Sequence, residues 1–293
     1  PLAKSEEAAA APPWAVYNQM KEFFEIKRIH EKTKSISDGL ELLMLVHPKK
    51  IPDRLIYMID QFVLRGGKLL VFIDPNSETE SFSPDANQIN GGNSSNLSEL
   101  LEKWGVELAE NKVVGDLLSA RRVEIGASDQ PSVTDYLAWL DIKKDHMDDT
   151  HQVTSKVQRL TFATSGFLKN NDKNNDMSFK RLVWSTTQSM QIDVSEVRIA
   201  PDPTTLLRNF VPSNEELTLA AEIKGNFLSN FPSGPPETKR DNFDKNKHLS
   251  KSIEPSTLVV IADADMLYDE YWLRYEQSGE VILIANNADF TVN

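Results

Sequence analysis

The sequence predicts an α/β fold with a mostly parallel sheet flanked by helices, carrying a large α+β insertion. Three observations favour it: residues 40–74 have the pattern of a strand, a helix and a second strand, residues 97–108 that of a helix and a strand, and residues 256–285 return to strand, helix and strand. Alternation of strands with helices is typical of parallel sheets, because each parallel strand needs a crossover to the next.

The N-terminal region divides into a polar segment and a helix. Residues 1–13 are rich in Ala, Pro and Glu and have no large apolar residue after Leu2, which predicts a linker or a frayed terminus. Apolar residues recur with helical spacing between residues 14 and 24, and residues 25–29 favour a short strand. We therefore expect order to begin near Trp14.

The first strand–helix–strand unit has the clearest pattern. Residues 40–46 form a near-continuous apolar run that ends at His47, as is typical of a strand buried on both faces of a parallel sheet. Pro52 suits the first turn of a helix, and two glycines end that helix before the next strand, residues 68–73. The unit predicts a right-handed crossover.

A polar loop follows this unit. Residues 76–96 are rich in Ser, Asn, Gly and acidic side chains, which predicts a long mobile loop. Residues 97–104 favour a helix, and a strand follows near residues 106–108. We assign residues 14–115 to the first part of the α/β core.

The alternation weakens between residues 116 and 255, which we interpret as an insertion or a second subdomain. Strand-like pieces occur at residues 159–163 and 181–186, and residues 214–223 favour a helix. Residues 229–255 contain several prolines and many charges with little apolar periodicity, which predicts a surface loop.

The α/β core is expected to resume over residues 256–293. Residues 257–262 predict a buried strand, residues 266–275 a helix with an acidic start, and residues 280–285 a further strand. This segment completes the predicted core.

Composition excludes several classes of protein. The 44 acidic and 32 basic residues give a formal net charge of −12, which argues against a nucleic acid or an anionic membrane surface as partner, since both need clustered Lys and Arg. The chain has no Cys, so disulfides, thiolate zinc sites and cysteine nucleophiles are excluded. The apolar runs are far shorter than the ~18 residues that span a bilayer. We interpret the chain as a fragment of a longer protein.

Polar residues follow the predicted strands at their carboxyl ends, where open α/β sheets bind ligands. The candidates for a ligand or partner edge are His47, Asp74, Asp263, Asp265, Asn286 and Asn287. The alternative is that these residues only make turns and cap the helices that follow.

Acidic residues near one of these strands raise the question of a metal. Asp263 and Asp265, with Asp269 and Glu270, are residues that a hard cation prefers. Their spacing fits no calcium loop, and acidic residues in the first turn of a helix are expected from the helix dipole. We therefore predict no metal and no other cofactor.

Motifs for nucleophilic catalysis and for nucleotide binding are missing from the sequence. There is no G-x-S-x-G nucleophile elbow, no G-x-x-x-x-G-K phosphate loop and no G-x-G-x-x-G dinucleotide motif. We expect a protein without enzymatic activity and without catalytic residues.

One long segment and several shorter ones carry a family resemblance. Residues 42–75, LLMLVHPKKIPDRLIYMIDQFVLRGGKLLVFIDP, contain a His-Pro after the strand, a Gly-Gly pair and a final Asp-Pro. Further segments agree in order: Pro12-Pro13-Trp14, 97–105, 113–116, Asp202-Pro203, 206–207, 219–221 with Gly225, 230–236, 259–267 and 286–290. Together they resemble the extracytoplasmic domain of the GldG-like family, gliding-motility-type auxiliary components of ABC transporters, over residues 12–293.

The resemblance implies an inner-membrane protein with one transmembrane helix before this segment and another after it. The domain itself is then periplasmic, beside an ABC permease and its ATPase. The resemblance also implies a fold similar to the class I glutamine amidotransferase-like and flavodoxin-like domains. Such amidotransferases need a cysteine nucleophile, which this chain lacks, so that activity is excluded.

We therefore expect a non-enzymatic extracytoplasmic interaction domain of a membrane-anchored ABC transport auxiliary subunit. Its partners are the permease and ATPase of the same system, contacted through the carboxyl edge of the sheet or through residues 116–255. The alternative is a module that binds an envelope glycan or a small solute in the same crevice. A metal-assisted hydrolase using Asp263 and Asp265 is a third hypothesis.

Overall fold

The computed structural model describes residues 14–30, 33–81, 93–95, 97–126, 131–171, 177–237, 243–276 and 278–293. The predicted linker, residues 1–13, lies outside the described residues. So do residues 82–92 and 96 of the predicted long loop and residues 238–242 of the predicted Pro-rich loop.

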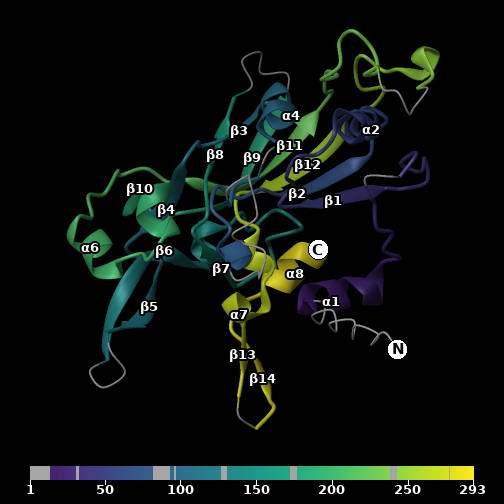
Figure 1. Ribbon diagram of the computed structural model, residues 1–293. Coiled ribbons are helices and arrows are strands. Elements are labelled where there is room, and N and C mark those ends of the chain that lie inside the picture. The colour runs from purple at the N-terminus through teal and green to yellow at the C-terminus, as the bar shows by residue number, and fades with distance from the viewer. Residues whose placement is uncertain are drawn as a thin grey trace, which may run out of the picture.

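In the described part of the chain, a seven-stranded sheet forms the centre of the molecule (Figure 1). Its strands in spatial order are β1 (Leu42–Val46), β2 (Lys68–Phe72), β12 (Ser256–Ile261), β11 (Thr218–Gly225), β8 (Leu168–Asn170) and β3 (Val106–Leu108), and β9 (Met177–Trp184) also pairs with β11. β1, β2 and β12 are parallel, whereas β11 is antiparallel to β12, β8 and β9. The predicted α/β class is confirmed, but the sheet is mixed rather than mostly parallel.

The unit of β1, α2 (Asp53–Leu64) and β2 has the predicted strand–helix–strand arrangement. β1 and β2 pair in parallel with Leu43 opposite Leu69, and Pro52 is the N-cap of α2. Gly66 follows the helix with φ 89°, a left-handed conformation that glycine adopts without steric cost. The predicted end of the helix is therefore confirmed.

The parallel strands are packed on both faces. Leu69 and Val71 belong to a core cluster with α2 and with Leu101 of α4 (Ser98–Lys103), the helix predicted at residues 97–104. Leu70 and Phe72 contact a second cluster, which includes β7 (Arg159–Ala163). Because successive side chains of a strand point to opposite faces, the apolar run fills both clusters.

Residues 116–255, predicted as an insertion or a second subdomain, contribute β8, β9 and β11 to the central sheet. Their other strands, with the adjoining β4, form two smaller antiparallel sheets: β4 (Lys112–Asp116) with β10 (Ser189–Asp193), and β5 (Ala120–Ile125) with β6 (Ser132–Lys143) and β7. The helices of this stretch are η2 (Lys144–His146), α5 (Val194–Arg198), α6 (Pro203–Arg208) and η3 (Lys245–Lys247). The strands predicted at residues 159–163 and 181–186 correspond to β7 and to the end of β9.

Three predictions of local structure are wrong. Residues 214–223 form no helix and instead lead into β11, because pairing with β12 and β9 overrides the helix preference of Ala and Glu. Residues 25–29 form no strand. Residues 266–275 do not form one helix: the chain there consists of η4 (Asp265–Leu267), α7 (Asp269–Trp272) and β13 (Leu273–Tyr275).

The first and last helices pack against each other. α1 (Ala15–Phe23) lies beside α8 (Asn287–Val292) (Figure 1). The Gln19 side-chain amide donates to Asp289 at 3.3 Å, and the backbone N–H of Ala15 donates to Asp269 at 2.8 Å. The two ends of the described chain are therefore held on one side of the molecule.

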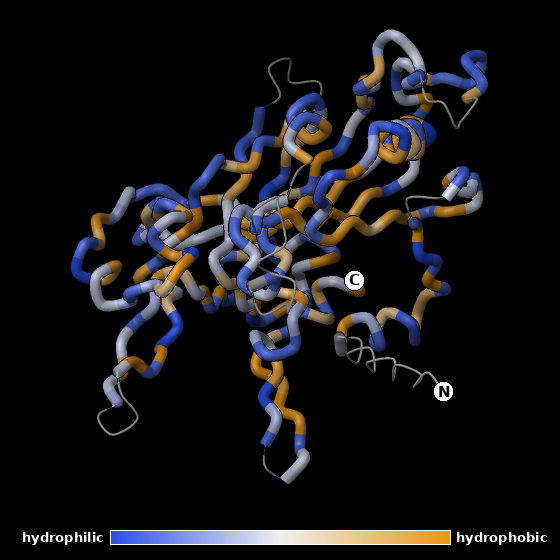
Figure 2. The backbone as a smooth tube through the Cα atoms, in the orientation of Figure 1, coloured by the Kyte–Doolittle hydropathy of each residue, from blue (hydrophilic) through white to orange (hydrophobic). Residues whose placement is uncertain are grey.

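A hairpin projects from the body next to these helices. β13 pairs with β14 (Val281–Leu283), so the strand predicted at residues 280–285 belongs to this hairpin and not to the central sheet (Figure 1). Figure 2 shows that much of the hairpin is apolar. No helix in the described ranges has both the length and the apolar character needed to cross a membrane.

Candidate functional site

The carboxyl ends of β2 and β12 bring three carboxylates together. Asp74 follows β2, and Asp263 and Asp265 follow β12, the neighbouring parallel strand. One oxygen from each of the three side chains lies within 4.8 Å of the others, and all three residues are fully buried. We call Asp74, Asp263 and Asp265 the carboxylate triad.

Asp74 joins the ends of the two parallel strands. Its Oδ1 accepts the backbone N–H of Asn76 at 2.8 Å, and its Oδ2 accepts the N–H of Ala264 at 2.9 Å. The first bond forms the turn after β2, and the second crosses to the residues after β12. Asp74 therefore fixes the local geometry of this edge.

Asp263 extends the same network toward the smaller sheet. Its Oδ2 accepts the N–H of Ala163, at the end of β7, at 2.7 Å, and its Oδ1 accepts the N–H of Met266 at 3.0 Å. The carboxylate thus connects β12, β7 and the start of η4.

Asp265 fixes the segment that leaves β2. It accepts the hydroxyls of Ser77 at 2.8 Å and Thr79 at 2.6 Å, together with the backbone N–H groups of Glu78 at 2.5 Å and Thr79 at 3.2 Å. These residues begin α3 (Glu78–Ser81). The start of the predicted mobile loop is therefore fastened to the edge by one carboxylate.

Burial changes the acidity of the triad. Loss of solvation raises the pKa of Asp74 and of Asp263 well above the ordinary value of an Asp side chain. Repulsion by Asp265, and for Asp74 also by Asp263, adds to this rise, and burial also raises the pKa of Asp265. Hydrogen bonds from backbone N–H groups oppose this rise because they favour the charged form. Within the described ranges, these three side chains are the ones placed to share a bound cation or a proton.

His47 lies beside the triad at the end of β1. Its backbone has φ 45°, and its Nδ1 lies 2.9 Å from the Ser95 hydroxyl oxygen, which itself accepts the N–H of Asp74. The Ser95 hydroxyl can donate its hydrogen to Nδ1, and a neutral His47 then carries its proton on Nε2. That atom faces Glu80 at 3.4 Å. Burial lowers the pKa of His47, although Glu80 partly offsets this effect.

Asn286 and Asn287 do not follow a strand of the central sheet, because β14 belongs to the hairpin. The Asn287 amide donates to the carbonyls of Thr161 and Met266, each at 2.8 Å, and accepts the N–H of Thr161 at 3.0 Å. Asn286 donates to Asp289 at 3.0 Å. The premise that both residues follow a strand of the central sheet is wrong. The Asn287 contacts fasten α8 to β7 and to η4, and the Asn286 contact lies at the start of α8.

Glu78 and an aromatic group were not found from the sequence. The carboxylate of Glu78 accepts the Trp139 indole N–H and the Tyr271 hydroxyl, each at 3.0 Å, and burial raises its pKa. Burial and Glu78 together raise the pKa of Tyr136 and of Tyr271. The Tyr136 hydroxyl is buried without a hydrogen-bond partner in the part of the chain that the structure describes. Glu78 belongs to the polar stretch 76–96, whose sequence has no local pattern that predicts these distant partners.

The profile of a family described as an ABC-type uncharacterized transport system matches residues 2–293. The chain belongs to this ABC transport auxiliary family. No curated protein matches it. Among solved structures, the mmIFT52 N-terminal domain is similar with a TM-score of 0.44 and 12% identity, over 94% of this chain and 85% of that chain. The predicted auxiliary role in ABC-type transport is thus confirmed at the level of the family.

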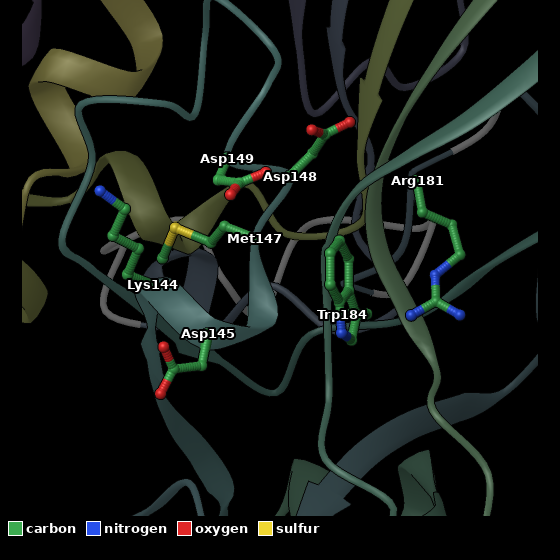
Figure 3. A pocket seen from close by; sticks show the side chains of 7 residues that line it. All are labelled: Lys144, Asp145, Met147, Asp148, Asp149, Arg181 and Trp184. Carbon is green, nitrogen blue, oxygen red and sulfur yellow. The ribbon is translucent and has the colours of Figure 1, made fainter.

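A separate open groove lies on the surface of this auxiliary protein. It encloses about 590 Å³ and is lined by Lys144, Asp145, Met147, Asp148, Asp149, Arg181 and Trp184 (Figure 3). The guanidinium of Arg181 lies 4.7 Å from the centre of the Trp184 ring and pairs with Glu216 at 2.7 Å. The groove therefore combines an aromatic side chain with charges of both signs.

Asp148 has the most perturbed acidity in this groove. Although partial burial raises its pKa, hydrogen bonds from Lys180 and Thr150 outweigh that effect and lower the pKa to about 2. The Lys180 ammonium lies 2.7 Å from the carboxylate. The pattern of the sequence around residues 144–149 did not predict a groove, because Arg181 and Trp184 come from β9, far along the chain.

Proposed function

We propose that this chain is the extracytoplasmic, non-enzymatic interaction domain of a GldG-like, membrane-anchored auxiliary subunit. The observation that carries the proposal is the family match over residues 2–293. In this proposal the partners are the permease and ATPase subunits of the same ABC transport system, and a class I glutamine amidotransferase-like core serves as a scaffold without that chemistry.

The residues at the carboxyl ends of β2 and β12 support a scaffold role. In class I amidotransferase-like enzymes a cysteine nucleophile is required, and this chain has none. The carboxylates of the triad accept hydrogen bonds from the backbone of their own chain and are fully buried. Direct contact of Asp265 with a partner requires residues 77–79, whose groups it accepts, to move away, so the predicted partner edge stays a prediction.

The packing of the terminal helices supports the proposed anchoring. Since α1 lies beside α8, chain that enters α1 and chain that leaves α8 lie on one side of the domain, as two flanking membrane helices require. The net charge of −12 opposes binding to anionic lipid or to nucleic acid. Attachment to a periplasmic membrane surface therefore depends on segments outside the domain.

The test is purification of the tagged full-length protein from its native membranes in a mild detergent, followed by quantitative mass spectrometry. Recovery of one permease and one ATPase in a fixed ratio to the tagged protein is the expected result. Recovery of the tagged protein without either subunit, in several detergents and after reversible cross-linking, would contradict the proposal.

A second candidate function is the binding of an envelope glycan or a small solute, favoured by the groove at Trp184. Its volume of about 590 Å³ lies within the range of ligand sites, and Asp145 and Asp149 offer acceptors for sugar hydroxyls. Glycan fragments are expected to raise the unfolding temperature of the domain in a saturable way, and Trp184→Ala should abolish that rise. An unchanged unfolding temperature at millimolar glycan would count against this candidate.

A further inference from the structure

The β13–β14 hairpin presents an apolar face to solvent. Leu273 pairs with Leu283 and Tyr275 with Val281, and residues directly opposite one another in an antiparallel pair share a face. Tyr275 is 58% exposed, Val281 50% and Leu283 54%. Leu273, at the base of the hairpin, is half-buried against the core, so the exposed part of this face consists of Tyr275, Val281 and Leu283. We call these three side chains the hairpin face.

The base of the hairpin is held rigidly. Trp272, directly before β13, is buried, and its carbonyl accepts the N–H of Ile284, directly after β14, at 2.8 Å. Tyr271 is fixed by its hydrogen bond to Glu78. A two-stranded hairpin is only marginally stable by itself, so a projecting hairpin with a firm base and an uncovered apolar face is suited to packing against another surface.

The charges around the hairpin face restrict what can cover it. Asp269 and Glu270 lie at its base, and Glu276 and Glu280 lie near its turn, whereas Arg274 is paired with Glu276 at 3.2 Å. A second copy of this chain would bring like charges together, and anionic lipid would be repelled. A protein surface with an apolar strip flanked by Lys or Arg is complementary both to the apolar side chains of the hairpin and to the acidic residues around them.

We infer that the hairpin face binds the extracytoplasmic surface of the membrane-spanning subunit of the same ABC transport system, at an apolar strip flanked by basic side chains. This inference rests on the proposed function and adds the surface and the chemistry of the partner to it. The hairpin lies on the same side of the molecule as α1 and α8 (Figure 1), which is the side that faces the membrane when helices flank the domain.

The test compares full-length variants in native membranes that contain the whole transport system. The double variant Val281→Ser/Leu283→Ser removes two half-exposed aliphatic side chains from the hairpin face. Ile199→Ser/Val211→Ser is the matched control, because these residues are 80% and 71% exposed and lie far from the hairpin in the sequence. We expect the hairpin variant to reduce recovery of the membrane-spanning subunit by about tenfold, with no change for the control.

Two further measurements separate the causes of a loss. The unfolding temperature of each purified variant should match that of the wild type, since the replaced side chains are exposed. A photoreactive residue in place of Val281 should cross-link to the membrane-spanning subunit, and Glu280→Lys should weaken that cross-link while Glu99→Lys on α4 should not.

The outcomes distinguish this inference from the proposed function. Recovery of the subunit at the wild-type level by the hairpin variant, or cross-linking of position 281 to lipid or to a second copy, overturns the inference and leaves the proposed function standing. Failure of the wild type to recover any subunit of the system overturns both.

Discussion

Asp60 connects α2 to the segment at residues 229–230, and its removal should lower the free energy of unfolding by about 3 kcal/mol. The side chain is fully buried, and it accepts the Ser229 hydroxyl at 2.8 Å, the Asn230 N–H at 2.8 Å and the Gln61 amide at 2.9 Å. In Asp60→Ala the Gln61 amide keeps the Leu249 carbonyl at 3.0 Å as acceptor, whereas the Ser229 hydroxyl and the Asn230 N–H each lose a short bond and the Asn230 side-chain amide loses a long one of 3.4 Å. The two short bonds dominate the loss. At roughly 1.5 kcal/mol for each bond to a charged group, the loss is about 3 kcal/mol.

Urea unfolding followed by tryptophan fluorescence measures this loss. Trp104 is fully buried, and its indole N–H donates to Leu228 at 3.1 Å, so its emission reports on the same region. The matched control is Asp202→Ala, which also removes a carboxylate that accepts from Thr204 and Thr205, but at an exposed helix start. A loss below about 1 kcal/mol for Asp60→Ala, or one no larger than that of the control, would refute the reasoning.

Three further predictions concern pH and packing. Because the pKa of Asp74 is raised in the folded state, folding retains a proton that the unfolded chain loses; the contribution of Asp74 to stability is therefore greatest at low pH and is lost as pH rises above about 4, and Asp74→Asn should flatten this loss in thermal unfolding scans. Asp148 has the opposite sign: its pKa is lowered to about 2, so its stabilising contribution is lost as pH falls from about 4 toward 2, and an NMR titration should show the pKa rise toward its ordinary value once Lys180 is replaced by Met, with the Thr150 hydrogen bonds still lowering it. Gly67→Ala places a Cβ 2.4 Å from the Phe62 ring, which should cost about 1 to 3 kcal/mol in urea unfolding, whereas no measurable cost would show that Phe62 moves freely.

The sequence predicts elements whose signals are local and misses elements that depend on partners distant in the chain. The β1–α2–β2 unit was predicted because its signals are local: a short apolar run, a Pro before the helix and glycines after it. β11 was missed because its structure depends on two partners distant in the sequence, and residues 214–223 alone favour a helix.

In the candidate site, too, the predictable features are those that follow from the local pattern, and the missed ones depend on distant partners. The positions of Asp74 and Asp263 at neighbouring strand ends follow from the parallel pairing, which the sequence predicts. That Asp265 holds Ser77 and Thr79 does not follow, because 186 or more residues separate them from it and a polar loop carries no pattern that names its partner. Asn286 and Asn287 were placed at the same edge only because β14 was taken for a strand of the central sheet.

The contact between α1 and α8 has a mechanical consequence. If both ends of the domain are tethered, tension applied through either tether reaches the molecule at one place, where Gln19 meets Asp289 and Ala15 meets Asp269. The hydrogen bonds between β1, β2 and β12 are then not the first contacts to carry the force. A pull between two such tethers is therefore taken up first by the contacts of α1 with α8 and with Asp269.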